Sequence, residues 1–324
     1  MLRQLSLEVL VGPAERRRAL RRDIERGLSA PSKHIPPVWF YDEAGSLLFE
    51  EITRLPEYYP TRAERAILDR HAFEVVEAAA ADTLVEIGSG TSEKTRLLLD
   101  AMATAGSLER IVLFDISRDV LLPAAEELGR TYGVDVHAIV GDFWHDLGAI
   151  PPQGRQLWAF LGGTIGNLRP QERRRLLERF RQQMGGAGHL LLGTDLVKES
   201  RRLLAAYDDS AGVTAAFNRN VLNVVNRELG GGFEPESFDH RAVWDPRQSW
   251  IEMRLRARKA QQVAIEEMAL VVELAEGEEI LTEISAKFTP DSVREELQGA
   301  GFSPAALWRD DAGDFQLTLA SVPT

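Results

Sequence analysis

Residues 82–195 alternate short runs of aliphatic residues with longer amphipathic stretches. The short runs have the length and composition of buried strands, and we expect strands at 83–87, 111–115, 134–140, 157–161 and 189–193. Hydrophobic residues recur at the helical period between them, and we expect helices from residue 61 and at 91–105, 117–132 and 170–184. Strands and helices that alternate along a chain are typical of an α/β fold with a parallel, doubly wound sheet.

The pattern changes over residues 199–288. One or two helices are predicted at 215–229, and strands are expected after a run of three glycines, at 239–245, 249–258, 262–274 and 280–288. Helices and strands are segregated here, which indicates a separate α+β lobe. The tail returns to the first pattern, with a helix at 291–300 and strands near 306 and at 315–320. We therefore predict a sheet-forming core that an inserted lobe interrupts.

Composition excludes several classes of protein. The chain has 324 residues, enough for one large domain or two ordinary ones, and 38 Lys and Arg against 50 Asp and Glu give a net charge of −12. This charge, without a basic cluster, argues against a nucleic-acid partner. No apolar run approaches the ~20 residues of a membrane span. The absence of Cys rules out disulfides, thiolate nucleophiles and Cys-based zinc sites. We expect a cytoplasmic monomer that holds no metal.

A glycine-rich turn follows the first predicted strand of the core. Gly88 and Gly90 lie between that strand and the next helix, where glycine lets the backbone approach a ligand and free N–H groups favour polar or anionic groups. A dinucleotide fingerprint would have a third small residue at position 93, where this chain has Glu93. A long acidic side chain fits poorly beside a pyrophosphate, so an NAD-dependent oxidoreductase is disfavoured.

Polar residues also end the next two predicted strands. Asp115 is placed to accept hydrogen bonds from ribose hydroxyls, while Asp142 and Phe143 offer a carboxylate and an aromatic face to an adenine. Each has an ordinary alternative, because an Asp at a strand end often caps the next helix and Phe143 is a candidate core residue. The ordered set of three elements on an alternating β/α background favours S-adenosylmethionine (SAM) as the ligand.

Longer segments resemble the SAM-dependent histidine N-alpha-methyltransferases, which make hercynine, the trimethylated histidine of ergothioneine biosynthesis. The matching segments follow in order over nearly the whole chain: WFYD at 39–42, TRLPEYYPTR at 53–62, EIGSGTSEKT at 86–95, GTIGNL at 163–168, GTDLVK at 193–198, YDD at 207–209, AAFNRN at 215–220 and LTEIS at 281–285.

The resemblance implies a Rossmann-like class I SAM methyltransferase core, over 61–196 plus 286–324, and an α+β histidine-binding lobe, over 1–60 plus 197–285. It also implies the site residues. SAM, and S-adenosylhomocysteine as its product, would contact Gly88, Lys94, Asp115, Asp142 and Phe143. Histidine would contact Tyr41, Tyr58, Gly162, Asn167, Tyr207, Met253, Glu283 and Ser285.

Methyl transfer to an amine is an in-line displacement that asks the protein mainly to position the nitrogen and exclude water. Asn167 and Tyr58 are the expected catalytic residues, since they would hold the backbone groups of the amino acid. Glu283 and Ser285 are two apart, so in a strand they share a face and match the two imidazole nitrogens. A solvated strand face is the ordinary alternative for this pair. Gly162 and its small neighbours would leave room for three successive methyl groups.

Two other functions fit part of the pattern. One is a SAM-dependent N-methyltransferase of another amino acid, and the other is a SAM-binding sensor without catalysis. A sensor has no need of residues that bind a methyl-accepting substrate. The chain has such residues, which argues against a sensor: Tyr58, Asn167, Tyr207, Glu283 and Ser285.

Overall fold

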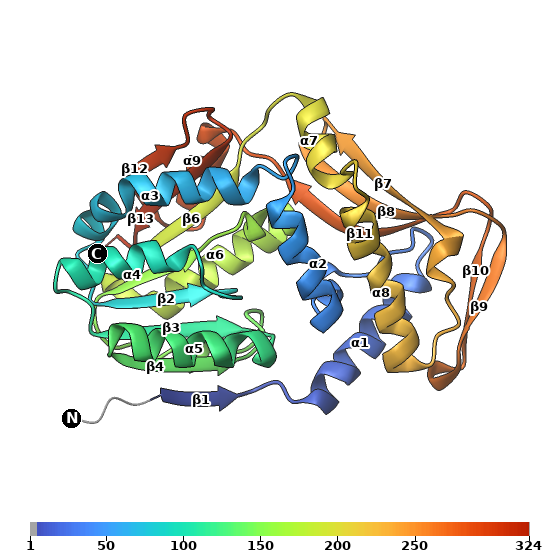
Figure 1. The fold of residues 1–324 in the computed structure, drawn as a ribbon, viewed down its shortest axis with the longest axis horizontal. Helices are drawn as coiled ribbons and strands as arrows, with labels where there is room; N and C mark the ends of the chain where they lie inside the picture. The colour runs from blue at the N-terminus through green and yellow to red at the C-terminus, as the bar shows by residue number, and fades with distance from the viewer. Residues whose placement is uncertain (1–4, 324) are drawn as a thin grey trace. The chain divides into compact units, whose positions relative to one another are not determined.

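The computed structural model describes residues 5–323, and the chain divides into two units (Figure 1). The first unit comprises Met1–Val11, Pro60–Val197 and Phe288–Thr324, and the second comprises Gly12–Tyr59 and Lys198–Lys287.

The first unit is built on an eight-stranded sheet with the order β1-β4-β3-β2-β5-β6-β13-β12. Its strands are β1 (Leu5–Val9), β2 (Thr83–Ile87), β3 (Arg110–Asp115), β4 (Asp135–Val140), β5 (Gln156–Phe160), β6 (His189–Asp195), β12 (Ser303–Arg309) and β13 (Phe315–Ser321). Neighbouring strands from β1 to β6 pair in parallel, whereas β13 runs antiparallel to both β6 and β12. The strand order reverses direction at β2 and β5, where a doubly wound sheet forms its ligand crevice. The predicted Rossmann-like class I core is confirmed.

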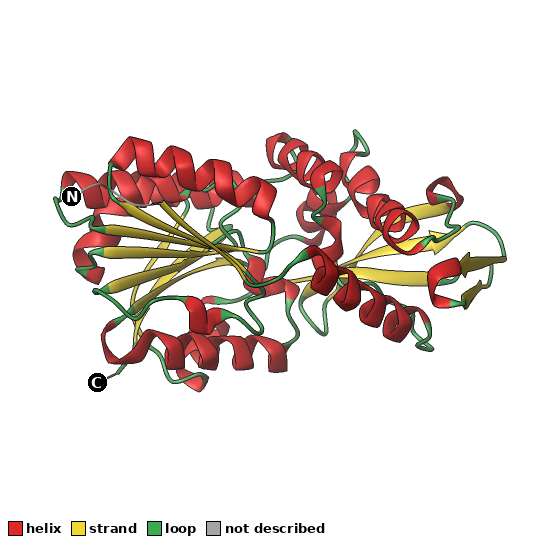
Figure 2. Cartoon of the chain, turned by 90° about the horizontal axis from the view of Figure 1, so that it is seen from below, coloured by secondary structure: helices red, strands yellow, loops and turns green. Residues whose placement is uncertain are grey.

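Helices cover both faces of this sheet (Figure 2). They are α3 (Pro60–Ala79), α4 (Thr95–Thr104), α5 (Arg118–Tyr132), α6 (Pro170–Met184) and α9 (Pro290–Gly299), with short 3₁₀ turns η2 (Leu147–Ala149), η3 (Thr164–Asn167) and η4 (Gly185–Ala187). Apolar residues of α3, α4 and α5 form one core with the sheet. On α6, Phe180 packs against the rings of Trp158 and Phe160 in β5. The sheet is therefore buried on both sides, as its nearly continuous hydrophobic strands require.

Two predictions for the first unit need correction. The prediction gave all of residues 1–60 to the histidine lobe, but β1 pairs with β4 along Leu5 to Val9 and extends the core sheet. The alternation of Leu with polar residues in this short segment was the available signal. The helix predicted at 91–105 begins only at Thr95, because Ser92 has a positive φ of 55° that a helix cannot contain.

The second unit combines helices with two small antiparallel sheets of order β11-β8-β7 and β10-β9. Its helices are α1 (Pro13–Leu28), η1 (Pro37–Phe40), α2 (Glu43–Arg54), α7 (Ser200–Tyr207), α8 (Val213–Leu229), η5 (Pro235–Ser237) and η6 (Glu266–Met268). Its strands are β7 (Phe238–Asp245), β8 (Trp250–Ala257), β9 (Gln261–Ile265), β10 (Leu270–Leu274) and β11 (Glu279–Ala286). One hydrophobic core joins these elements.

The strand predicted at 262–274 is wrong as a single element. It is a hairpin in which β9 and β10 are joined by η6, and Ala269 has a positive φ of 49° at the turn. The turn contains no Gly or Pro, so the sequence carries no strong signal for it. Helices α1 and α2 were not predicted either, although Pro13 occupies the first turn of α1.

Candidate active site

The glycine-rich turn between β2 and α4 is tied to the end of β3. Gly88 N donates to Phe114 O at 2.8 Å, and Gly90 N donates to Asp115 Oδ2 at 2.9 Å. Gly88 and Gly90 have φ values of +70° and +49°, which favour glycine. A Cβ on either glycine would meet no heavy atom within 4 Å outside the adjacent residues. The turn therefore has the backbone conformation and the open space that a bound nucleoside requires.

Two further polar groups belong to this turn. The buried Glu86 carboxyl accepts hydrogen bonds from Ser92 Oγ at 2.6 Å and from Thr95 Oγ1, and burial raises the pKa of Glu86 to about 7. The Ser89 hydroxyl is buried and has no hydrogen-bond partner among residues 5–323. A buried hydroxyl without a partner is costly, so Ser89 fits a ligand contact that the residue-level prediction missed.

Asp115, Asp142 and Phe143 lie at the carboxyl ends of β3 and β4, which are adjacent strands. Asp115 Oδ1 accepts a hydrogen bond from Ser117 N at 2.8 Å. Asp115 therefore also caps the start of the next helix, which was the alternative role considered for it. Asp142 Oδ1 accepts from Trp144 N at 2.8 Å, and burial raises the pKa of Asp142. Each carboxylate retains lone pairs for further hydrogen bonds. The structure thus brings the glycine turn, Asp115, Asp142 and Phe143 to one edge of the sheet.

Lys94 is held by a buried carboxylate. Its Nζ contacts Glu64 Oε2, and Gly162 N donates to both Glu64 carboxylate oxygens at 2.9 Å. Glu64, near the start of α3, has no exposed surface. One glutamate therefore fixes both a predicted SAM contact and the backbone after β5. Nothing in the local sequence signalled this pairing.

The segment after β5 carries Gly162 and Asn167. Gly162 and Gly163 have consecutive positive φ values of +75° and +69°, so these positions need glycine for backbone reasons as well as for space. Asn167 ends η3 and is half-buried. None of the described residues hydrogen-bonds to its side-chain amide, which leaves both ends of the amide for a ligand.

Polar side chains of the second unit meet at the end of α7 and along β11. Tyr207 OH and Ser285 Oγ are 2.7 Å apart. Lys287 Nζ donates to Tyr207 OH at 2.9 Å and to Ser285 Oγ at 2.8 Å. All three side chains are buried. Tyr207 and Ser285 were predicted as substrate contacts, but Lys287 was not, and its position two residues after Ser285 was the only available signal.

Glu283 lies in the same strand and is buried, with 8% of its surface exposed. A β-bulge interrupts β11 between Leu281 and Glu283, but pairing with β8 is regular from Glu283 to Ala286. Glu283 and Ser285 therefore share a face, and Met253 stands directly opposite Glu283. No residue between 5 and 323 hydrogen-bonds to the Glu283 carboxyl. Burial raises its pKa to about 7, and the charge of Lys287 opposes this rise.

Tyr41 and Tyr58 belong to an aromatic cluster of the second unit. The rings of Tyr41 and Tyr58 each contact Phe49 edge-on, with centroids 5.7 and 6.2 Å away. Tyr58 also meets the Tyr207 ring edge-on at 6.3 Å. This packing links Tyr58 to the polar residues of β11, whereas Met253 is part of the hydrophobic core.

A buried hydrogen-bond chain supports β11 and α7. Thr282 Oγ1 donates to Asn218 Oδ1 at 2.6 Å, and the Asn218 amide contacts His240 Nδ1 at 2.8 Å. His240 Nε2 then contacts the Tyr207 backbone oxygen at 2.8 Å. Burial lowers the pKa of His240, which favours the neutral ring that this arrangement needs. The prediction did not include these residues.

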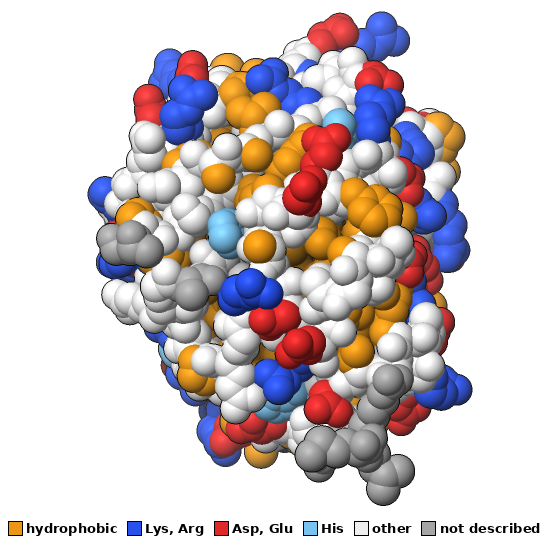
Figure 3. Space-filling view, turned by 90° about the vertical axis from the view of Figure 1, so that its left-hand side faces the viewer, with side chains coloured by type: hydrophobic (Ala, Val, Ile, Leu, Met, Phe, Trp, Pro, Cys, Tyr) orange, Lys and Arg blue, Asp and Glu red, His pale blue; other side chains and the backbone are white. Residues whose placement is uncertain are grey.

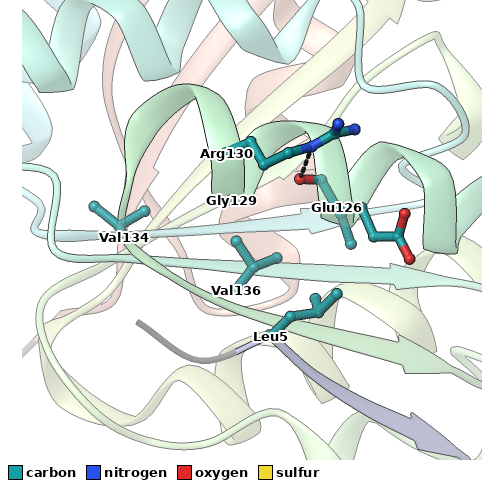
Figure 4. A pocket seen from close by; sticks show the side chains of 7 residues that line it. Leu5, Glu126, Gly129, Arg130, Val134 and Val136 are labelled. Atoms are coloured by element: carbon teal, nitrogen blue, oxygen red, sulfur yellow. Dashed lines mark hydrogen bonds between the residues drawn. The ribbon is translucent and has the colours of Figure 1, made fainter. Parts of the chain in front are cut away.

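Other surface features do not coincide with these residues. A groove in the first unit is lined by Leu5, Ala125, Glu126, Gly129, Arg130, Val134 and Val136, none of them a predicted site residue (Figure 4). On the face shown in Figure 3, acidic and basic side chains are interspersed. Within residues 5–323, no cluster of three or more His, Cys, Asp or Glu residues is arranged to hold a metal. No helix in the same range is long and apolar enough to cross a membrane.

The fold and the glycine turn are those of a nucleoside-binding α/β domain, and comparison with known proteins identifies a SAM-dependent methyltransferase and specifies its family. A family model described as histidine-specific methyltransferase, SAM-dependent, matches residues 20–322, so the chain belongs to this family. The family uses SAM, which removes the NAD-dependent alternative.

Curated relatives agree with this assignment. The chain is 54% identical to histidine N-alpha-methyltransferase of Mycolicibacterium smegmatis, over 93% of this chain and 94% of the relative. It is 53% identical to the protein of that name from Mycobacterium tuberculosis, over 94% and 95%. It is also 27% identical to ergothioneine biosynthesis protein 1 of Schizosaccharomyces pombe, over 96% of this chain and 40% of that longer protein.

Proposed function

We propose that this protein transfers three methyl groups in succession from SAM to the α-amino nitrogen of L-histidine, giving hercynine for ergothioneine biosynthesis. The family and the curated relatives support histidine as substrate. The observation that carries the proposal within the structure is the buried Glu283 carboxyl, which has no hydrogen-bond donor among the described residues and shares a strand face with the Ser285 hydroxyl.

Glu283 and Ser285 suit a neutral imidazole ring. Such a ring has one N–H donor and one nitrogen acceptor, and the pair offers one carboxylate acceptor and one hydroxyl donor. A buried site of this kind rejects a substrate that leaves its polar groups unpaired, by as much as about 10⁴-fold. Met253, opposite Glu283, would shape the pocket wall, and Tyr41 would complete it.

The proposed cofactor contacts of the first unit fit SAM by the same reasoning. Gly88 and the Ser89 hydroxyl lie at the open glycine turn, while Asp115 would accept from ribose hydroxyls and Asp142 from the adenine amino group, with Phe143 beside the base. Lys94, fixed by Glu64, would meet the carboxylate of the amino-acid part. SAM supplies an electrophilic methyl group, so the protein needs no covalent nucleophile.

The amino acid's backbone groups are assigned to Tyr58, Asn167 and Tyr207. The free amide of Asn167 offers an oxygen that orients the amine and an NH₂ group for the carboxylate, while the tyrosine hydroxyls are donors for the carboxylate. The amine must lose its proton before each transfer, and a nearby positive charge lowers the pKa of an ammonium group. Gly162, which has no side chain, would leave room for the growing substituent.

Purified protein incubated with SAM and each of the twenty amino acids tests the substrate assignment. Mass spectrometry should show mono-, di- and trimethylated histidine and no product from the other amino acids. Glu283→Ala should abolish most of this activity. Glu279→Gln is the matched control, because Glu279 lies in the same strand but pairs with Arg254. Methylation of another amino acid in preference to histidine would refute the proposal.

We further propose that the active form is a cytoplasmic monomer. Light scattering coupled to size-exclusion chromatography should give a mass near the 36.1 kDa of one chain. A stable dimer at assay concentration would contradict the monomer.

A further inference from the structure

Glu64 is a buried carboxylate that contacts two of the groups proposed to bind ligands. Gly162 N donates to both of its oxygens at 2.9 Å, and Lys94 Nζ contacts its Oε2. The Lys94 side chain keeps 22% of its surface exposed, whereas the Glu64 side chain keeps none. Lys94 can therefore still reach a ligand, while Glu64 acts on a ligand only through the groups that it holds.

We propose that Glu64 is a positioning residue for the amino-acid part of SAM: it holds the Lys94 ammonium group beside Gly162, where Lys94 meets the carboxylate of the cofactor. The inference rests on the proposed function, which assigns this carboxylate to Lys94. It adds a determinant of cofactor binding from α3, an element that holds none of the predicted SAM contacts.

The glycines around Glu64 show where the carboxylate and its partner lie. A Cβ on Gly193 of β6 would lie 2.3 Å from Glu64 Oε1, so the absence of a side chain there makes room for the carboxylate. A Cβ on Gly162, just after β5, would lie 3.6 Å from Lys94 Nζ. The strand order reverses between β2 and β5, and ligands of doubly wound sheets bind at such a point. Glu64 therefore holds the ammonium group at the expected ligand crevice.

Fixing Lys94 in advance favours binding of the cofactor. Lysine is among the side chains that lose most rotamer freedom when they are ordered. Glu64 imposes this order in the free protein, so the cofactor does not have to impose it on binding. Without the carboxylate, an amide at position 64 could still accept from Gly162 N but would give Lys94 no counter-charge. The ammonium group would then be better solvated by turning toward water, away from the crevice.

Isothermal titration calorimetry of the whole protein with two ligands tests the inference. S-adenosylhomocysteine and 5′-methylthioadenosine share the adenosine and the sulfur, but the second lacks the amino-acid part. Glu64→Gln should weaken binding of S-adenosylhomocysteine at least about fivefold and leave the affinity for methylthioadenosine within about twofold. Equal weakening of both ligands would assign Glu64 to support of the fold alone. That result, or unchanged or tighter binding of S-adenosylhomocysteine, would overturn the inference.

Glu296→Gln is the matched control. Glu296 lies on α9 of the same unit and pairs with the buried Arg173, whose Nη2 donates to Glu296 Oε1 at 2.6 Å. Neither residue is a proposed SAM contact. Both affinities should stay within about twofold of those of the wild type. A loss confined to S-adenosylhomocysteine in this variant too would mean that any broken ion pair of the unit has the effect, which would refute a special role for Glu64.

Glu64→Asp covers the case in which Glu64→Gln does not fold. It keeps the counter-charge of Lys94, but its side chain is one methylene shorter, so the carboxylate withdraws from the ammonium group. S-adenosylhomocysteine should bind at least about threefold more weakly, and methylthioadenosine should again stay within about twofold. Equal affinities of Glu64→Asp and the wild type for S-adenosylhomocysteine would contradict the positioning role.

A double variant tests whether Glu64 acts through Lys94. In Glu64→Gln/Lys94→Met both charges are gone, and replacing a buried pair by neutral groups is often tolerated. It should bind S-adenosylhomocysteine within about twofold of Lys94→Met, whereas independent effects would multiply and overturn the inference. If Lys94→Met itself leaves this affinity unchanged, the proposed Lys94 contact is wrong and the inference falls with it. A selective loss in Lys94→Met without one in Glu64→Gln would refute the inference alone, so the two failures are distinguishable.

Discussion

The buried carboxyl groups of Glu64 and Glu283 differ in what surrounds them. Glu64 is matched by Lys94 and the Gly162 N–H, whereas Glu283 has no hydrogen-bond donor among residues 5–323. A paired buried charge supports the fold, and an unpaired one costs stability. The contrast separates a structural carboxylate from one held ready for a ligand, and each has a measurable consequence.

Glu64→Ala should destabilise the first unit. The substitution leaves the Lys94 ammonium and the Gly162 N–H without their acceptor, and breaking a buried pair in this way costs about 3 kcal/mol or more. Urea unfolding followed by circular dichroism measures the loss. Glu74→Ala, an exposed position on the same helix, should change the free energy of unfolding by less than about 1 kcal/mol. Equal losses in the two variants would contradict the assignment.

Glu283→Gln should stabilise the protein above neutral pH while removing histidine methylation. The Glu283 pKa rises from 4.5 when unfolded to about 7 when folded, so the folded state holds the proton more tightly and loses stability as pH rises through this range. At 1.36 kcal/mol per pH unit, the cost above pH 7 reaches at most about 3 kcal/mol. Thermal unfolding should show a gain of a few degrees at pH 8.5 and almost none at pH 4.5. A gain of the same size at both pH values would be inconsistent with this linkage.

At the scale of elements, local patterns located most strands and helices but missed two kinds of feature. Period-two alternation identified β11 and the shared face of Glu283 and Ser285, yet the bulge before Glu283 leaves no mark in the sequence. The hydrophobic pattern also continues across the turn at Ala269, so a single strand was predicted at 262–274 where the structure has a hairpin. Turns without Gly or Pro depend on the packing of the strands that they join.

The turn at Gly162 and Gly163 offers a test at this scale. Gly163→Ala should cost about 1 kcal/mol or more of stability, because an L-residue is strained at a φ of +69° although a Cβ would find only ordinary contacts. The strained turn should also displace Asn167 and raise the histidine KM. Gly148→Ala is the control, since Gly148 has open space and no positive φ. If Gly163→Ala behaves like this control in both assays, the turn does not position Asn167.

At the scale of the molecule, each unit carries its own set of proposed ligand contacts. The proposed SAM contacts all belong to the first unit, and the proposed imidazole contacts all belong to the second. The N-terminal strand is the main departure from the predicted division, because β1 completes the edge of the core sheet. The other boundaries move by one or two residues, which places Pro60 and Val197 in the first unit and Ala286 and Lys287 in the second. Histidine would also contact Gly162 and Asn167 of the first unit, so the proposal places only SAM within a single unit, and binding measurements can test it.

Asp115→Ala should weaken binding of S-adenosylhomocysteine at least about tenfold, because it removes the proposed ribose acceptor and the carboxylate that holds Gly90 N. Glu283→Ala should leave this affinity within about twofold. Isothermal titration calorimetry measures both. Comparable weakening by the two substitutions would show that the second unit's carboxyl contributes to cofactor binding, contrary to the proposal.

The sequence by itself determined most elements of the core, their parallel arrangement and, through extended motifs, the family and most of the proposed contacts. It did so because hydrophobic periodicity and glycine placement are local properties of the chain. The tertiary structure decided which polar groups meet. Glu64 reaches Lys94 across 30 residues, and Lys287 reaches Tyr207 across 80. Such contacts arise only when distant segments pack together, and burial then determines whether a carboxyl group is paired or left to a ligand.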